Sequence, residues 1–122
     1  MKLNPDCIRE ILFAVEAQTG FLKPTYAYDV VELVDFPEEE VLYHINQCEL
    51  YGFFTKVTHY VNQDYNSKIM DLSPKGHEFI QNIRSQSVWG KTKELAKSAG
   101  SFAIGILADT AISVVKARLS ID

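Results

Sequence analysis

Most of the information on the fold lies in one segment, residues 35–72, DFPEEEVLYHINQCELYGFFTKVTHYVNQDYNSKIMDL. It begins with the spacing of a capping box, from Asp35 to Glu38, with Pro37 in between. Gly52 follows the last helical residue and can take the conformation that ends a helix. The apolar residues between these signals are spaced as on one helix face: Val41, Leu42, Ile45 and Cys48.

A strand pattern follows Gly52. Residues 53–61 are rich in β-branched and aromatic side chains, residues 62–67 are polar, and an apolar run lies around residues 69–72. Two such runs separated by polar residues predict a two-stranded hairpin with a polar tip. Because two strands are too few to stand alone, we expect the hairpin to lie on helices.

The chain before residue 35 predicts two helices. Asn4, Pro5 and Asp6 provide an N-cap acceptor, a proline and an acid in the first turn. They predict a helix over residues 4–18, with Gly20 as its end. The apolar spacing in residues 26–34 predicts a second helix of about two turns.

The chain after the hairpin also has helical patterns. Ser73 and Pro74 predict a helix start, and Phe79, Ile80 and Ile83 are placed to face the core. We expect Trp89 to pin the following chain to the core. A final helical stretch runs over residues 91–119.

The resulting order is three helices, two strands and two helices, which is typical of a winged helix-turn-helix. The fold class predicted is mainly α with a small β-hairpin. We expect a winged helix-turn-helix-like domain over residues 1–97 and a C-terminal apolar helix within residues 98–122.

Four stretches carry a resemblance to a known family: MKLNPDCIR (residues 1–9), Tyr43-His44, LSPKGHEF (residues 72–79) and WGKTK (residues 89–93). They resemble a prokaryotic and phage-encoded family of unknown function, number 2513, over about residues 1–97. The resemblance implies a winged-helix-like fold in a prokaryotic or phage setting. It implies no established activity, catalytic residue or ligand.

Composition limits the class of protein. The chain has 122 residues, of which 47% are hydrophobic and 23% charged, so it is expected to be one folded domain and not a disordered or disulfide-rich chain. Cys7 and Cys48 lie in helical patterns, which favours buried free thiols. Since no secretory signal pattern begins the sequence, we expect a cytoplasmic protein of a prokaryotic cell or phage-infected host.

The charges divide unevenly along the chain. Residues 1–52 hold three basic and ten acidic residues, whereas residues 53–122 hold nine basic and six acidic ones. With a net charge of −4, the whole protein is not expected to be attracted electrostatically to a polyanion such as DNA. Its second half nevertheless offers a local basic face.

A DNA reader with this arrangement would use the third helix and the hairpin. However, Glu38, Glu39 and Glu40 in the first turn of that helix would repel a duplex, so DNA binding is the less favoured hypothesis. The candidate DNA-contacting residues are His44, Asn46, Gln47, Lys56, Lys68 and Lys75.

Little in the sequence indicates catalysis or a cofactor. His44 and Cys48 are four residues apart, but a zinc site needs three or four ligands and no second ligand pair is present. The tripeptide at Gly90 lacks the earlier glycine of a phosphate-binding loop, since Ser85 stands there. We therefore expect no enzyme activity, metal or cofactor.

The tail is the most informative segment for function. From residue 102 to 119 its apolar residues cover nearly the whole circumference of a helix, more than a small domain can bury. We therefore expect a homo-oligomer or a partner protein to cover part of it, or alternatively that the helix packs back on its own domain. The predicted interface consists of Phe102, Ile104, Leu107, Ala108, Ala111, Val114 and Val115.

The sequence thus predicts a non-catalytic protein-interaction module of a prokaryotic or phage regulatory system that self-associates through its C-terminal helix. A dimeric DNA-binding transcriptional regulator is the alternative. Peripheral membrane binding through the C-terminal helix is weaker still. A membrane-spanning helix is not expected, because Asp109 interrupts the apolar stretch over residues 98–115, and the runs on either side are too short to cross a bilayer.

Overall fold

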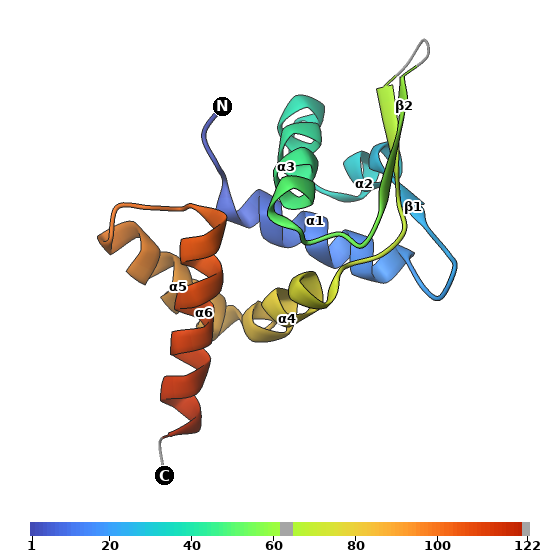
Figure 1. The fold of residues 1–122 in the computed structure, drawn as a ribbon. Helices are drawn as coiled ribbons and strands as arrows, with labels where there is room; N and C mark the ends of the chain where they lie inside the picture. Colours follow the sequence, from blue (N-terminus) through green and yellow to red (C-terminus); the bar gives the residue numbers. More distant parts are fainter. Residues whose placement is uncertain (62–64, 121–122) are drawn as a thin grey trace.

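The computed structural model describes residues 1–61 and 65–120 and contains helices and a small antiparallel sheet (Figure 1). Part of the predicted hairpin tip, residues 62–64, lies outside the described residues. The helices are α1 (Pro5–Gln18), α2 (Ala27–Leu33), α3 (Glu38–Tyr51), α4 (Pro74–Ile83), α5 (Gln86–Ser98) and α6 (Ile104–Leu119). The strands are β1 (Thr25–Tyr26), β2 (Val57–Val61) and β3 (Tyr65–Ile69). The predicted class, mainly α with a small sheet and a C-terminal helix, is confirmed.

Helix α1 covers the residues that the sequence predicts, but Gly20 is not the residue that ends it. The Asn4 side-chain oxygen accepts hydrogen bonds from the backbone N–H groups of Asp6 and Cys7. Its last residue is Gln18, as predicted, and the C-cap residue is Thr19, which is extended and whose N–H donates to the Val15 carbonyl. Extended backbone needs no glycine, so the positive φ expected at Gly20 does not occur.

The start of helix α3 differs from the start that the sequence predicts. The predicted capping box from Asp35 does not form, because Pro37 is the N-cap residue and its carbonyl accepts the N–H of Val41. The end of the helix is as predicted: Gly52 takes the left-handed conformation, at φ 93°, and its N–H donates to Glu49.

The sheet has three strands where two are predicted. Its order is β1-β3-β2, and both outer strands pair antiparallel with β3. Strand β1 has only Thr25 and Tyr26, and the second of these is the first residue of the helix predicted over residues 26–34. The second hairpin strand, Tyr65–Ile69, begins within the stretch predicted to be a polar tip. There the Asn66 side chain accepts the N–H of Tyr28 in α2, and the Ser67 hydroxyl is hydrogen-bonded to Nδ1 of His59 in β2. Backbone pairing continues beyond the strand as far as Phe54 with Leu72.

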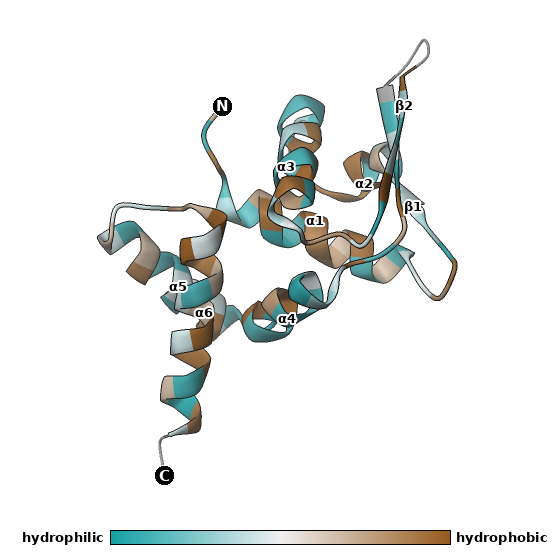
Figure 2. Cartoon of the chain, in the orientation of Figure 1, coloured by the Kyte–Doolittle hydropathy of each residue, from teal (hydrophilic) through white to brown (hydrophobic). Residues whose placement is uncertain are grey.

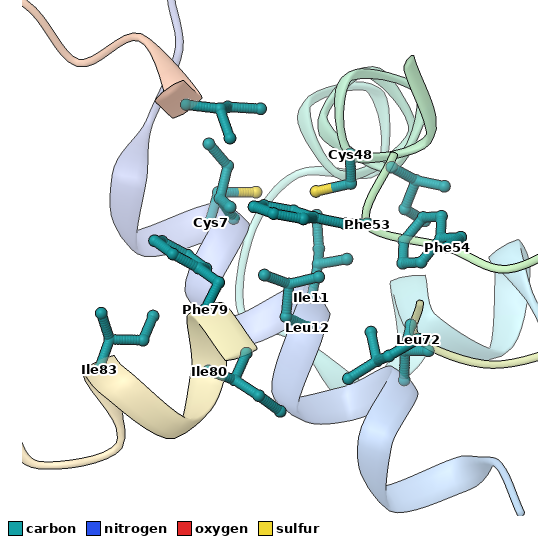
Figure 3. Packing of buried hydrophobic residues seen from close by; sticks show 14 of the residues in the cluster. Cys7, Ile11, Leu12, Cys48, Phe53, Phe54, Leu72, Phe79, Ile80 and Ile83 are labelled. Carbon is teal, nitrogen blue, oxygen red and sulfur yellow. The ribbon is translucent and has the colours of Figure 1, made fainter. Parts of the chain in front are cut away.

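The core lies where α1, α3 and α4 meet (Figure 3). Cys7 and Cys48 face each other between α1 and α3, and both are reduced thiols, as predicted. The Phe53 and Phe79 rings are stacked 5.1 Å apart, and the Phe79 ring meets the indole of Trp89 edge to face. The aromatic stack joins the main core to the C-terminal helices.

The predicted single C-terminal stretch is two helices. Helix α5 ends at Ser98, Gly100 just beyond it has φ 78°, and the chain turns before α6 begins. The prediction for Trp89 is confirmed, since its ring is buried and its indole N–H donates to an Asp6 carboxylate oxygen at 2.8 Å. Helix α6 packs on α5 and α4, so both C-terminal helices share the core of α1–α4.

Candidate functional site

His44 is not on the surface that a DNA contact would need. Its side chain is fully buried, with Nδ1 hydrogen-bonded to the Glu40 carbonyl at 2.7 Å and Nε2 accepting the N–H of Asn4 at 2.8 Å. It therefore fastens the start of α1 to α3. The prediction that His44 contacts DNA is wrong, because the ring lies on the helix face that packs against α1.

The other five candidate DNA contacts lie in three places. On α3, Asn46 is exposed and Gln47 half-buried. By strand register, Lys56 and Lys68 share the sheet face opposite the core. Lys75, in the first turn of α4, donates to the Tyr51 carbonyl and lies 3.8 Å from the Tyr51 ring centroid.

Helix α3 presents an acidic and apolar surface beside these residues. Glu38 and Glu39 are exposed in its first turn, and Leu50 is exposed near its end. Carboxylates at a helix start are stabilised by the helix dipole, but they would face the phosphates of a duplex with like charge.

Helix α6 hides most of the predicted oligomer interface within its own subunit. Ile104, Leu107, Ala111 and Val114 form one buried stripe. The other three residues of that predicted set, Phe102, Ala108 and Val115, are half-buried. The stripe cannot meet another chain while the domain is folded.

The opposite side of α6 is polar. Asp109, Ser113 and Lys116 recur at helical spacing and are exposed. Figure 2 shows the resulting alternation of hydrophilic and hydrophobic residues along α6. The helix is therefore amphipathic, and the apolar residues it leaves open lie on its two flanks.

One flank of α6 closes a pocket against α3 and α4, with a volume of about 130 Å³. Its aromatic lining comes from Tyr51 at the end of α3, Phe53 just after it and Phe79 of α4. Ala108 and Ile112 line it from α6. A side chain on Gly105 would come within 3.3 Å of the Tyr51 hydroxyl, so this glycine admits the Tyr51 ring. The polar residues of the lining are Lys75, Glu78, Asn82 and Asp109.

The other flank of α6 forms a groove with α5, of about 310 Å³. Leu95 from α5 and Val114 and Ala117 from α6 give it apolar walls. Lys91 and Arg118 contribute cations, and Arg118 also donates to Ser87 across the two helices. Beyond the groove, Leu119 is 78% exposed at the end of α6.

Among the described residues, Cys7, Glu40 and His44 bring three possible ligand atoms within 4.8 Å of one another. The Asn4 nitrogen, however, lies 2.8 Å from Nε2 of His44, where its N–H occupies the lone pair that a metal would need. A zinc ion would sit about 2.0–2.1 Å from Nε2 and would collide with that nitrogen. The cluster is therefore built for hydrogen bonding.

Neither cysteine is suited to nucleophilic chemistry. Burial, and then the charges of Glu40 and Glu10, raise the pKa of the Cys7 thiol to about 12. Burial also raises the pKa of Cys48. Both side chains are thus protonated thiols near neutral pH, and these are poor nucleophiles.

The loop between α1 and β1 carries two exposed apolar side chains that are not among the site residues predicted from the sequence. Phe21 is 94% exposed and Leu22 is 75% exposed. The only sequence signal is an apolar pair between Gly20 and Lys23, where turn residues are usually polar. Periodicity cannot detect such a pair, because it lies outside any helix or strand.

The family model described as "Hypothetical protein (DUF2513)" matches residues 2–102. The chain belongs to this family. The resemblance seen in the sequence is thereby confirmed. The DUF2513 match spans α1–α5, and α6 begins just beyond it, at Ile104.

A bacterial protein is similar to this DUF2513 chain. It is described as an uncharacterized protein of Haemophilus influenzae (strain ATCC 51907 / DSM 11121 / KW20 / Rd), and is 30% identical over 101 residues, which cover 80% of each chain. No solved structure matches significantly. Of the helices that the structure describes, none has the length and apolar character needed to cross a bilayer.

Proposed function

We propose that this DUF2513 protein is a non-catalytic protein-interaction module that self-associates through its C-terminal helix, in a cytoplasmic regulatory system of a prokaryote or phage. The similar bacterial protein supports the prokaryotic setting. Two reduced, buried thiols are typical of a reducing compartment, which supports the cytoplasm.

The observation that carries the proposal is the apolar surface left on both flanks of α6. Ala108 and Ile112 stay half-buried beside α4, and Ala117 stays exposed beside α5. Apolar surface that the folded subunit leaves in water is stabilised when another surface covers it. A second subunit placed along either flank would cover such surface.

The arrangement of the first elements supports a winged-helix-like module. Their order, α1-β1-α2-α3-β2-β3, places α3 and the hairpin together as exposed features, as in winged-helix domains. The exposed Glu38, Glu39 and Leu50 of α3 favour a protein as the partner of this surface over a nucleic acid.

Sedimentation velocity over a wide concentration range tests self-association. Ile112→Asp combined with Ala117→Asp places one charge on each flank of α6, and we expect this variant to remain monomeric where the unmodified protein associates. Leu33→Asp, at a residue of α2 that is 55% exposed, is the matched control and should associate normally. An unmodified protein that is monomeric throughout would refute the proposal.

The alternative is a dimeric DNA-binding regulator. Lys56 and Lys68 on the outer face of the sheet favour it, since a basic hairpin can hold phosphates. Retention on heparin and a salt-dependent shift of a random duplex, both weakened by Lys56→Ala with Lys68→Ala, would support this function. Absence of DNA binding at low salt would exclude this alternative function.

A further inference from the structure

The loop from Gly20 to Lys23 is a rigid apolar knob. The N–H of each end residue donates to the carbonyl of the other, at 3.0 Å in both directions. The two bonds close a tight turn whose tip is Phe21 and Leu22, the first of them almost fully exposed. The backbone of this tip therefore has little conformational freedom to lose on binding.

The backbone of the knob is strained. Leu22 has φ 59°, in the left-handed region, and no other non-glycine residue of the described chain has a positive φ. A leucine there is unfavourable, because its side chain crowds the backbone. Backbone strain clusters at functional sites, and exposed apolar side chains mark interaction surfaces, so the strain at Leu22 supports the loop as an interaction element.

The pocket between α3, α4 and α6 is a matching hole. Its volume of about 130 Å³ is close to that of engineered apolar cavities of about 150 Å³ that bind benzene, so it suits one phenyl ring. Its lining of aromatic and aliphatic groups offers edge and face contacts to such a ring.

The charges around knob and hole are complementary. Lys23 ends the loop, and Glu78 and Asp109 are the two acids in the pocket lining. The cation of the lining, Lys75, already donates to Tyr51 and lies on its ring. The acids of the lining outnumber its one lysine, so an entering cation would meet a site of net negative charge.

The knob cannot fill the hole of its own subunit. In Figure 1 the loop that leads from α1 to β1 and the helix α6 lie on opposite sides of the molecule. Any contact between them must join two copies, with different surfaces used on each copy. Such a heterologous contact leads to a closed ring or an open chain.

We propose that Phe21 of one copy inserts into the pocket formed by α3, α4 and α6 of a second copy, with Lys23 facing Glu78 and Asp109. This rests on the self-association proposed above and assigns it to the α4 flank of α6. An apolar tip could also enter a membrane, but only one lysine accompanies it and residues 1–52 are strongly acidic, so anionic lipid would repel the loop.

Two single variants and their mixture test the proposal by sedimentation velocity. Phe21→Ala removes the knob and leaves the hole, whereas Ala108→Phe fills the hole and leaves the knob. We expect each variant alone to associate roughly tenfold or more weakly than the unmodified protein. Mixed, they should form a heterodimer that grows no further, because only one intact knob and one intact hole remain.

Charge reversal gives a second experiment that leaves the aromatic and aliphatic lining of the pocket unchanged. Lys23→Glu and Asp109→Lys each change an exposed residue, and each should weaken association alone. Their mixture should recover part of the lost affinity. Circular dichroism of all four variants checks that they are folded.

The outcomes separate the two proposals. If the unmodified protein associates but Phe21→Ala and Ala108→Phe associate equally well, the knob-and-hole contact is refuted and self-association stands. If the unmodified protein is monomeric, both are refuted. Phe21-dependent flotation with anionic vesicles, without self-association, would assign the knob to a membrane and would also overturn the proposal.

Discussion

At the scale of single residues, Gly76 shows how tightly α4 is attached to the end of α3. A Cβ at this position would lie 2.4 Å from the carbonyl oxygen of Phe53, which is part of the backbone and cannot swing away. The same carbonyl accepts the N–H of Ser73, whose hydroxyl in turn donates to Gly52. Only a residue without a side chain allows this approach.

Gly76→Ala should therefore lower the free energy of unfolding by about 2 kcal/mol or more, because the added methyl group overpacks a rigid backbone contact. Urea denaturation measures the change. Gly90→Ala is the control, since this glycine also lies inside a helix but has nothing within 4 Å of the added carbon. The control should gain roughly 0.5–1 kcal/mol, and a similar gain at Gly76 would contradict the geometry.

The carboxylate of Asp6 gives the stability an acid-sensitive component. Burial raises its pKa, but hydrogen bonds from Lys93 and Trp89 outweigh this effect and place the pKa below its ordinary value of 3.8. A pKa lowered by folding contributes stability above the ordinary value, and that contribution is lost as the pH falls through the folded-state value.

Asp6→Asn should therefore be less stable than the unmodified protein near neutral pH. The difference in free energy of unfolding should shrink as the pH falls below 3.8, since protonation removes the same charge from the unmodified protein. Denaturation at a series of pH values measures it. Asp35→Asn, at an exposed residue before α3, is the control, and a difference that is constant with pH would contradict the assignment.

At the scale of elements, neighbouring positions of α6 should differ sharply in their contribution to stability. Leu107 is fully buried on the packed stripe, whereas Ile106 is 40% exposed. Leu107→Ala should cost about 3 kcal/mol and Ile106→Ala less than about 1 kcal/mol. Thermal and urea unfolding compare them, and equal costs would mean that α6 is not oriented as described.

The elements that the sequence predicts well are those marked by local signals. Asn4 and Ser73 cap α1 and α4 through contacts within a few residues, and Gly52 ends α3 through its own backbone. Strand β1 has no local signal, since two residues become a strand only by pairing with β3. The break between α5 and α6 has a sequence signal in Gly100. Helical apolar spacing on both sides of this glycine nevertheless predicts one continuous helix.

At the scale of the whole molecule, the segment that matches the family model ends before the hydrophobic core does. The match ends at Phe102, but the cluster of buried residues continues into α6 through Ile104, Leu107 and Ala111. These side chains cover apolar residues of α4 and α5. Helices α4 and α5 therefore depend on α6 to shield part of their apolar surface from water.

A chain ending at Phe102 should bind a dye such as ANS and unfold with reduced cooperativity, because the surface that α6 covers would be open to water. Dye fluorescence and calorimetry compare it with the full chain. A shortened chain that unfolds as cooperatively as the full one, without dye binding, would show that α6 is dispensable for the core.

The candidate site itself could be only partly predicted from the sequence. The acidic start of α3 and the apolar character of the tail are visible in residue order. The pocket is not, because Tyr51, Phe79 and Ile112 come from three helices whose packing no local pattern specifies. Likewise, His44 appears polar and available in sequence, and only its partner Asn4, forty residues away, shows it to be internal.

The position of Trp89 makes its intrinsic fluorescence sensitive to the packing of the C-terminal helices. It is the only tryptophan of the chain, and it lies where α1, α4 and α5 meet, with Arg9 and Lys93 above its ring. Any event that separates the C-terminal helices from α1 must change the polarity around this indole. Its intrinsic emission spectrum can therefore follow such an event in real time, without a label or an added chromophore.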